Sequence, residues 1–254
     1  MCRMISFVGY DKLIFGEFFK SLQSVCQNDP LKDLDPDGVA EHSDGWGYLD
    51  SNDTFINFSK FSEPIYRCTM PEFKGKYRII HARNASKSQP MGFMKSHPYH
   101  SATLKFDHFL MHNGLVDKEK IRHNLTSESL EYMTDSEVLL DLICSFDGKD
   151  LETMLRNALK GVYSKNALIS GLNIFFFSIG KDGRDQNLII YSDALKFDEY
   201  HRLYYSEGNN WKCVYSSSIL YSKYFPKAVH KIPLEPRTLY GMGDDGLVIL
   251  SQIN

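Results

Sequence analysis

Cys2 has the clearest potential for chemistry in this 254-residue sequence. If the initiator Met1 is removed, Cys2 carries both a thiol and a free α-amine. The unperturbed pKa values of these groups are roughly 8.5 and about 7.7–8.0. A nucleophile and a proton acceptor then share one residue, as in catalysis by N-terminal nucleophiles. A retained Met1 would turn that acceptor into a peptide nitrogen. The alternative is that Cys2 is a small apolar residue opening a buried strand.

Further polar clusters lie at the ends of predicted strands in the first half of the chain. They are His42-Ser43-Asp44-Gly45-Trp46-Gly47, His81-Ala82-Arg83, Ser96-His97-Pro98, His112-Asn113-Gly114 and Thr134-Asp135-Ser136-Glu137. Each is weak alone. Asn113-Gly114 is a common hairpin turn, Asp135 could assist a helix N-terminus, and Arg83 could be a solvated charge.

A metal site is the other chemistry that these side chains suggest, since seven of the nine histidines lie between His42 and His123. However, His108 and His112 fall in a strand-like run, where residues four apart stand far from each other. No glutamate occupies the H-E-x-x-H position either. We therefore predict no metal site and no cofactor.

Strands and helices must bring these clusters together. Apolar periodicity predicts helices over 13–25, 117–124, 136–146 and 151–162, the third preceded by the capping box Thr134-x-x-Glu137. Strands are predicted over 3–8, 45–49, 54–58, 77–81, 104–111, 172–179, 187–191, 202–205, 212–215, 237–241 and 247–251. The strand over 104–111 is expected to end abruptly at His112-Asn113-Gly114. Gly241 to Gly246 fits G-x-G-x-x-G, but no helix follows, so a hairpin turn is expected.

The bulk composition indicates an ordinary globular protein, with 43% hydrophobic and 24% charged residues. A net charge of −3 predicts no partner among nucleic acids or anionic membranes. The five cysteines are scattered without a C-x-x-C pair, which argues against a disulfide framework and for a reducing compartment. No apolar run is long enough for a secretory or membrane-spanning segment. We expect one cytoplasmic α+β domain over residues 2–254.

The clusters, taken in order with Cys2, resemble the class II glutamine amidotransferases, which are N-terminal nucleophile (Ntn) hydrolases. The resemblance is closest to the stand-alone members, whose relatives include γ-glutamyl amide hydrolases. The motifs cover residues 2–137, and the second half is supported more loosely by its succession of strands. The implied fold is a four-layer αββα sandwich of two antiparallel sheets.

The resemblance implies a role for each matching residue. Cys2 would attack the side-chain amide of glutamine. The side-chain amide of Asn113 and the backbone N–H of Gly114 would bind the oxyanion. Arg83 would pair with the substrate α-carboxylate and Asp135 with its α-ammonium group.

Further residues match the periphery of the family site. After the arginine, the synthetase-linked branch of the family usually has Trp and then Thr-His, whereas this chain has Asn84-Ala85-Ser86-Lys87. Ser86 can still offer a hydroxyl to the substrate α-carboxylate. His97 would help to shape the pocket or play a structural role. The family has a supporting loop beside the nucleophile, and its counterpart here is Gly45, Trp46 and Gly47.

The predicted activity is hydrolysis of glutamine or a related γ-glutamyl amide, through a γ-glutamyl thioester on Cys2, with release of ammonia or an amine. Since the amidotransferase module takes up the whole chain, any ammonia-accepting synthetase is expected to be a separate subunit. A catalytically idle sensor that binds glutamine would also be compatible with these residues. An Ntn amidase acting on different acyl amides would keep Cys2 without needing Arg83 and Asp135.

Overall fold

Two antiparallel sheets form the centre of the computed structural model, which describes residues 2–34, 38–86, 89–147, 149–195 and 198–253. Sheet A has the strand order β11 (Ile232–Pro233), β9 (Leu203–Gly208), β10 (Trp211–Ser216), β1 (Arg3–Gly9), β4 (Tyr77–Ala82), β2 (Trp46–Asn52) and β3 (Phe55–Phe61). Sheet B has the order β13 (Gly246–Gln252), β12 (Thr238–Gly243), β8 (Gln186–Ser192), β7 (Leu168–Gly180), β6 (Phe106–Val116) and β5 (Tyr99–Ala102).

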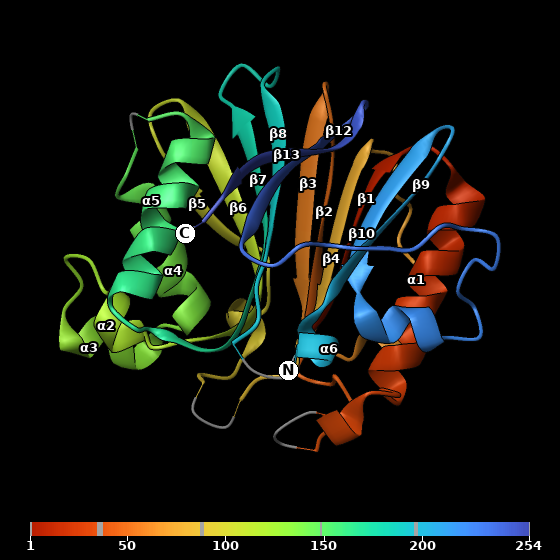
Figure 1. Cartoon of the computed structure of the whole chain (residues 1–254), viewed down its shortest axis with the longest axis horizontal. Helices are drawn as coiled ribbons and strands as arrows, with labels where there is room; N and C mark the ends of the chain where they lie inside the picture. The colour runs from red at the N-terminus through yellow and green to blue at the C-terminus, as the bar shows by residue number, and fades with distance from the viewer. Residues whose placement is uncertain (1, 35–37, 87–88, 148, 196–197, 254) are drawn as a thin grey trace.

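Helices cover the outer faces of the two sheets (Figure 1). Helix α1 (Lys12–Gln27) packs on sheet A. The helices beside sheet B are α2 (Lys118–Ile121), α3 (Ser127–Tyr132), α4 (Asp135–Cys144) and α5 (Leu151–Ser164). Short elements complete the chain: η1 (Lys32–Leu34), η2 (Ile65–Arg67), η3 (Phe93–Lys95), α6 (Asp198–His201) and η4 (Ser217–Tyr221). None of the helices in the described ranges combines the length and the apolar composition that a membrane crossing needs.

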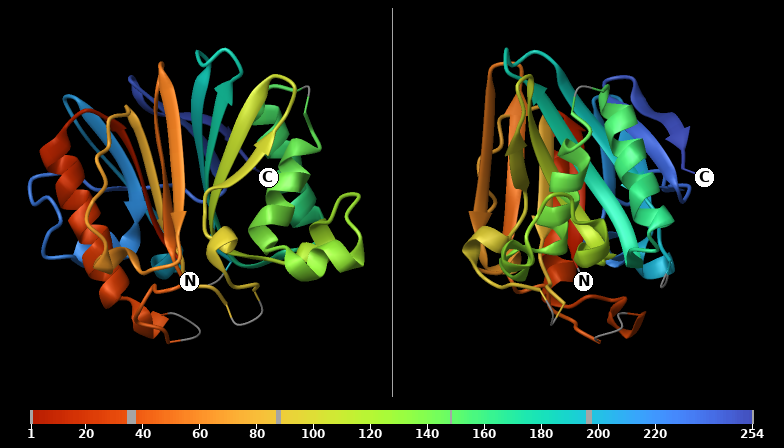
Figure 2. Two further views of the ribbon diagram at one scale, coloured as in Figure 1. Left: turned by 180° about the vertical axis from the view of Figure 1, so that it is seen from behind. Right: turned by 90° about the vertical axis from the view of Figure 1, so that its left-hand side faces the viewer.

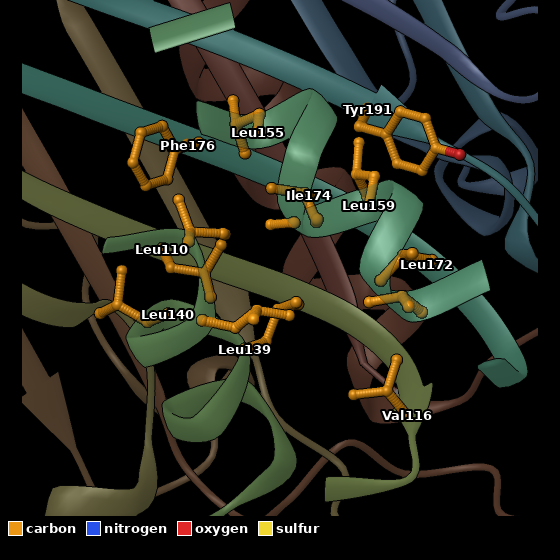
Figure 3. Packing of buried hydrophobic residues seen from close by; sticks show 14 of the residues in the cluster. Leu110, Val116, Leu139, Leu140, Leu155, Leu159, Leu172, Ile174, Phe176 and Tyr191 are labelled. Atoms are coloured by element: carbon orange, nitrogen blue, oxygen red, sulfur yellow. The ribbon is translucent and has the colours of Figure 1, made fainter. Parts of the chain in front are cut away.

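Three apolar clusters separate the four layers. One lies between α1 and sheet A, and one between the two sheets. The third lies between sheet B and helices α4 and α5, where Leu139 and Leu155 meet Leu110 and Phe176 (Figure 3). The view from behind shows the two sheets as neighbouring layers between the helices (Figure 2, left). The predicted αββα sandwich of α+β class is therefore confirmed.

Strand β1 illustrates why this sequence forms an inner strand. Ile5 and Phe7 belong to the cluster under α1, whereas Met4 and Val8 belong to the cluster between the sheets. Alternate side chains of a strand point to opposite faces, so both faces of β1 are buried. Burying each such side chain contributes about 1.5–3 kcal/mol. The burial holds the start of the chain at the middle of sheet A.

Most of the predicted elements are confirmed, including the hairpin of β2 and β3, the capping box of α4 and the turn between Gly243 and Gly246. The end of the strand predicted over 104–111 is wrong, because β6 continues to Val116. Asn113 and Gly114 pair with Asn173 and Leu172 of the long strand β7. The ladder to β7 thus outweighs the turn preference of the Asn-Gly pair. Strand β5 and helices α3 and α6 were not predicted, because each spans only four to six residues.

Candidate active site

Cys2 lies one residue before β1, at the end of sheet A that faces the end of β6. Its backbone nitrogen donates a hydrogen bond to Oδ1 of Asn113, 3.2 Å away. Its thiol donates to the carbonyl oxygen of Asn84 at 3.7 Å. Asn113 belongs to β6 in sheet B, and Asn84 follows β4 in sheet A. The N-terminal end of the chain therefore lies where the two sheets meet (Figure 1). Met1 lies outside the described residues, and its removal stays a prediction.

Asn113 presents a free donor beside this terminus. The side chain is almost fully buried, and its Nδ2 has no hydrogen-bond partner among the described residues. A buried donor without an acceptor costs about 1–3 kcal/mol. Because Oδ1 is engaged by the Cys2 nitrogen, the orientation of the amide is set and Nδ2 is left to donate to a ligand.

Gly114 cannot be replaced without moving the backbone. Its φ is +152°, a conformation that favours glycine. A Cβ here would overlap the carbonyl oxygen of Gly171 on the neighbouring strand. The β6–β7 register shifts between Gly114 and Val116, and such irregularities often occur next to active sites. The Asn113-Gly114 pair therefore marks an irregularity within strand β6 and not a hairpin turn.

Two histidines hold the end of β6 in place. Nδ1 of His112 lies 2.9 Å from Oγ of Ser136, on helix α4. Nε2 of His81, on β4, donates to the carbonyl oxygen of His112 at 3.0 Å. Burial lowers the pKa of His81 to about 3, so its ring is neutral at pH 7. These contacts connect α4 and sheet A to the residue preceding Asn113.

Arg83 follows β4 and is almost fully buried, with a relative exposure of 3%. Its Nη2 donates to the carbonyl oxygen of Pro90 at 2.8 Å, and its Nη1 lies 3.5 Å from the sulfur of Met91. The backbone N–H of Arg83 donates to the carbonyl oxygen of Gly45. The guanidinium is thus a buried cation whose present partners are neutral atoms of the following segment.

Asp135 is the first residue of α4. The reciprocal Thr134–Glu137 capping box fixes this helix end. Oδ2 of Asp135 accepts from the backbone N–H of Val116 at 3.1 Å, which ties the helix end to β6. The backbone N–H of Asp135 donates to Oε1 of Gln89 at 3.1 Å. The segment that contacts Arg83 therefore also contacts Asp135.

The electrostatics of Cys2 reflect both charges. Burial raises the pKa of the Cys2 thiol, the Arg83 cation opposes this rise and the Asp135 carboxylate adds to it. The thiol is consequently protonated at neutral pH, and a nucleophilic attack by sulfur requires a nearby proton acceptor.

His97 and Ser86 are peripheral in this geometry. His97 is buried, with its ring 3.8 Å from that of His81 and 4.6 Å from that of Tyr99, measured between centroids. Burial, reinforced by His81 and His112, holds the pKa of His97 well below its usual range. His97 therefore packs as a neutral ring. Ser86 is half-buried, and its carbonyl oxygen accepts from the backbone of Gln89.

Of the proposed supporting residues Gly45, Trp46 and Gly47, the last two pair within strand β2, and the carbonyl oxygen of Gly45 accepts from the backbone N–H of Arg83, so their supporting role stays a prediction. The Trp46 ring stacks on Phe61 at 4.4 Å, on the face of sheet A that α1 covers. Strand β4 stands between β2 and β1, so this segment is one strand away from Cys2. A Cβ on Gly47 would overlap the carbonyl oxygen of His97, which explains the glycine there.

Several residues beside Cys2 were not singled out from the sequence as parts of the site. Arg3, Asp29 and Ser218 form a buried polar cluster under the terminus. The sequence feature that could have revealed this cluster is Arg3, a cation next to Cys2 in a mostly apolar strand. A buried cation needs a carboxylate partner. Its carboxylate lies after α1, in a stretch with no periodicity. Among the described residues, no group of three histidine, cysteine, aspartate or glutamate side chains could hold a metal ion.

Compared by sequence, the chain matches no family model and no curated protein. Solved structures do match. The glutamine phosphoribosylpyrophosphate amidotransferase from B. subtilis aligns with a TM-score of 0.64 at 15% identity, over 98% of this chain and 49% of that one. A structure described as the allosteric regulatory enzyme of purine biosynthesis has the same TM-score at 17% identity, over 100% and 50%.

A third match has the length of this chain. The glutamine aminotransferase class-II domain protein from Silicibacter pomeroyi aligns over 100% of both chains, with a TM-score of 0.55 at 16% identity. This chain spans about half the length of the first two proteins. The neighbours share the arrangement of two antiparallel sheets between helices, and the chain has the fold of the class II glutamine amidotransferases.

Proposed function

We propose that this chain hydrolyses the side-chain amide of glutamine or of a related γ-glutamyl compound, with Cys2 as the N-terminal nucleophile. The observation that carries the proposal is the divided role of the Asn113 amide. Its oxygen binds the Cys2 nitrogen, while its buried nitrogen has no acceptor within the described part of the chain. A donor held in this way, beside a thiol, is what an oxyanion requires.

The first half of the reaction follows from the protonated state of the thiol. The α-amine of a processed Cys2 takes the thiol proton as sulfur attacks the amide carbon. The carbonyl oxygen becomes an oxyanion, which accepts hydrogen bonds from Asn113 Nδ2 and the Gly114 N–H. The carbon–nitrogen bond then breaks, the α-ammonium returns the proton to the leaving nitrogen, and ammonia departs. A γ-glutamyl thioester remains on Cys2.

The second half is hydrolysis of the thioester. The α-amine of Cys2 accepts a proton from water, whose oxygen attacks the thioester carbon. The same two donors, Asn113 and Gly114, stabilise the second oxyanion. The carbon–sulfur bond breaks, the thiol regains its proton, and glutamate leaves. An amine in place of water would give γ-glutamyl transfer by the same steps.

Recognition of the amino-acid head group is assigned to Arg83 and Asp135. Both charges act on the Cys2 thiol, so both lie within electrostatic reach of the reacting atoms. A planar guanidinium pairs with a carboxylate, and a carboxylate pairs with an ammonium group. Segment 89–91 contacts both residues: Pro90 accepts from the Arg83 guanidinium, and Gln89 accepts from the backbone N–H of Asp135, a bond that does not involve the Asp135 carboxylate. Ser86 and His97 are proposed to border this pocket.

The test is ammonia release from glutamine by the purified chain and by a Cys2→Ala variant. We expect steady release of ammonia and glutamate by the parent protein and none by the variant, with the same circular dichroism spectrum. Undiminished activity of Cys2→Ala contradicts the proposal.

The alignment with half of a phosphoribosylpyrophosphate amidotransferase favours a second candidate, in which the ammonia passes to an acceptor on another chain. That arrangement predicts that glutaminase activity is low alone and rises when a partner subunit binds. Robust ammonia release by the isolated protein favours simple hydrolysis. Binding of glutamine without any turnover, in a protein shown to lack Met1, indicates a sensor.

A further inference from the structure

The nucleophile is contacted from two opposite sides. Sheet B supplies Asn113, which accepts from the backbone nitrogen of Cys2 at 3.2 Å. On the other side Nη1 of Arg3 donates to the carbonyl oxygen of Cys2 at 3.2 Å. Arg3 shares the face of β1 that carries Ile5 and Phe7, which is the face toward α1. Its side chain thus turns back on the residue that precedes it.

The regular ladder of β1 stops short of Cys2 on one side. Pairing with β10 begins only at Ile5, opposite Tyr215. At Met4 the side chain of Ser216 replaces the ladder, accepting from the backbone N–H at 3.0 Å and donating to the carbonyl oxygen at 3.3 Å. At Cys2 the side chain of Arg3 takes this place. Side chains, and not strand pairing, therefore hold the terminal residues on the β10 side.

Arg3 can hold Cys2 because Arg3 itself is fixed. Its Nε donates to Oδ2 of Asp29 at 2.7 Å, and both side chains are fully buried. Nη1 also donates to the carbonyl oxygen of Tyr200 at 3.3 Å, and the guanidinium lies 3.8 Å from the centroid of the Tyr200 ring. One planar group thus connects the post-α1 segment, α6 and the nucleophile.

Asp29 is the anchor of this cluster. Its carboxylate accepts from Nε2 of His42, from Oγ of Ser218 and from the backbone N–H of Leu31, all within 2.9 Å. Burial alone would raise the pKa of Asp29, but Arg3 and His42 hold it well below its usual range. The carboxylate is therefore charged, as a buried guanidinium partner must be.

We propose that Arg3, anchored by Asp29, is a positioning residue that fixes the peptide plane of Cys2 and thereby aims its thiol and amine at the substrate amide. This inference rests on the proposed function. Misplacing a reacting group by about 1 Å can cost about 10²-fold in rate. The hydrogen bonds of the Arg3 and Asp29 side chains go to residues other than Arg83 and Asp135, so we expect the pair to act on the chemical step and not on substrate binding.

Arg3→Lys is the decisive variant. Lysine keeps the charge, but a single ammonium cannot reproduce the planar fork that spans Asp29, Cys2 and Tyr200. Arg78→Lys is the matched control. Arg78 is also buried in sheet A, and its Nε donates to the carbonyl oxygen of Gly75 at 2.9 Å. Its guanidinium lies over the ring of Phe15. Arg78 is opposite Phe7, however, and so lies toward the end of the strands that is far from Cys2.

Kinetics and hydrogen–deuterium exchange of both variants test the inference. Arg3→Lys should lower kcat for glutamine about 10²-fold with KM close to that of the parent. Exchange should also quicken in the peptide covering residues 2–8. Arg78→Lys should leave kcat and KM unchanged. If Arg3→Lys does not fold, Asp29→Asn takes its place, with an expected loss of about tenfold in kcat.

The outcomes separate this inference from the proposed function. An active parent protein whose Arg3→Lys variant keeps the parental kcat overturns the positioning role and leaves the function standing. An equal loss in Arg78→Lys also overturns it, because any buried arginine of the sheet would then serve. If the parent protein is inactive, the proposed function fails. The exchange measurement needs no activity, and an unchanged exchange rate of peptide 2–8 in Arg3→Lys overturns the positioning role by itself.

Discussion

At the scale of single residues, Asn113 joins the two sheets beside Cys2, the proposed nucleophile. Its amide oxygen faces the Cys2 nitrogen of sheet A, and its amide nitrogen is buried without an acceptor among the described residues. A protein keeps such a donor unpaired only at a cost of about 1–3 kcal/mol. If the donor gains its hydrogen bond only when an oxyanion develops, the bond stabilises the transition state more than the ground state and raises the rate.

Asn113→Ala should therefore lower kcat for glutamine by about 10²–10³-fold, with a much smaller change in KM. Asn113→Asp should be equally damaging, because it keeps an acceptor for Cys2 but removes the donor. Steady-state ammonia release is the measurement, and Asn187→Ala, on an exposed position of β8, is the control. An Asn113→Ala protein with parental kcat is incompatible with an oxyanion role.

The charged pair of the head-group site gives a second test at this scale. Asp135→Asn keeps an oxygen for the Val116 N–H but loses the charge that pairs with an α-ammonium group. Because hydrogen bonds to charged groups contribute about 1.5–3 kcal/mol, KM for glutamine should rise about 10–100-fold. A substrate analogue without the α-amine should show no such difference between parent and variant. Equal losses on both substrates refute the assignment.

At the scale of elements, the start of α4 positions Asp135. Thr134→Ala removes the N-cap of α4, and loss of such a cap costs about 1 kcal/mol of unfolding free energy. Because Asp135 follows directly, KM for glutamine should rise as well. Thr126→Ala is the control, since the exposed Thr126 side chain likewise caps α3, by accepting from the backbone N–H of Ser129. Denaturant unfolding and kinetics should show a loss of stability in both variants and a changed KM in Thr134→Ala alone.

The secondary-structure elements also show which parts of the fold could be predicted from the sequence. Apolar periodicity predicted β1, α1, α4 and α5, because burial of one face decides those segments. Periodicity could not show that β6 passes through Asn113-Gly114, since that depends on the length of its partner β7. Similarly, the polar stretch after α1 hid Asp29, whose importance comes from long-range contacts with Arg3 and Ser218. The resemblance named the candidate catalytic and binding residues, whereas the contacts that hold them in place could be seen only in the folded structure.

At the scale of the whole molecule, buried histidines couple stability to pH. Burial lowers the pKa of His42 to about 4 and that of His81 to about 3. In the unfolded chain both titrate near 6.5, so between about pH 6.5 and 4 the unfolded state binds more protons than the folded state. The free energy of unfolding should therefore fall as the pH is lowered through this window.

Asp29 acts in a separate window. Its folded pKa is depressed, so its contribution is present above the unfolded pKa of about 3.9 and is lost as the pH falls below it. Denaturant unfolding at pH 7, 5.5, 4.5 and 3 checks both effects. Equal stability at pH 7 and 4.5 contradicts neutral burial of the histidines. In Asp29→Asn the further loss between pH 4.5 and 3 should be reduced.

The measurement closest to the central claim is mass spectrometry of the protein quenched in acid during turnover of glutamine. We expect an intact mass without Met1, increased in a fraction of molecules by the mass of glutamine less ammonia. Peptide mapping should place the adduct on Cys2, and the Cys2→Ala variant should lack it. An adduct on one of the other four cysteines, or turnover by protein that retains Met1, contradicts catalysis by an N-terminal Cys2.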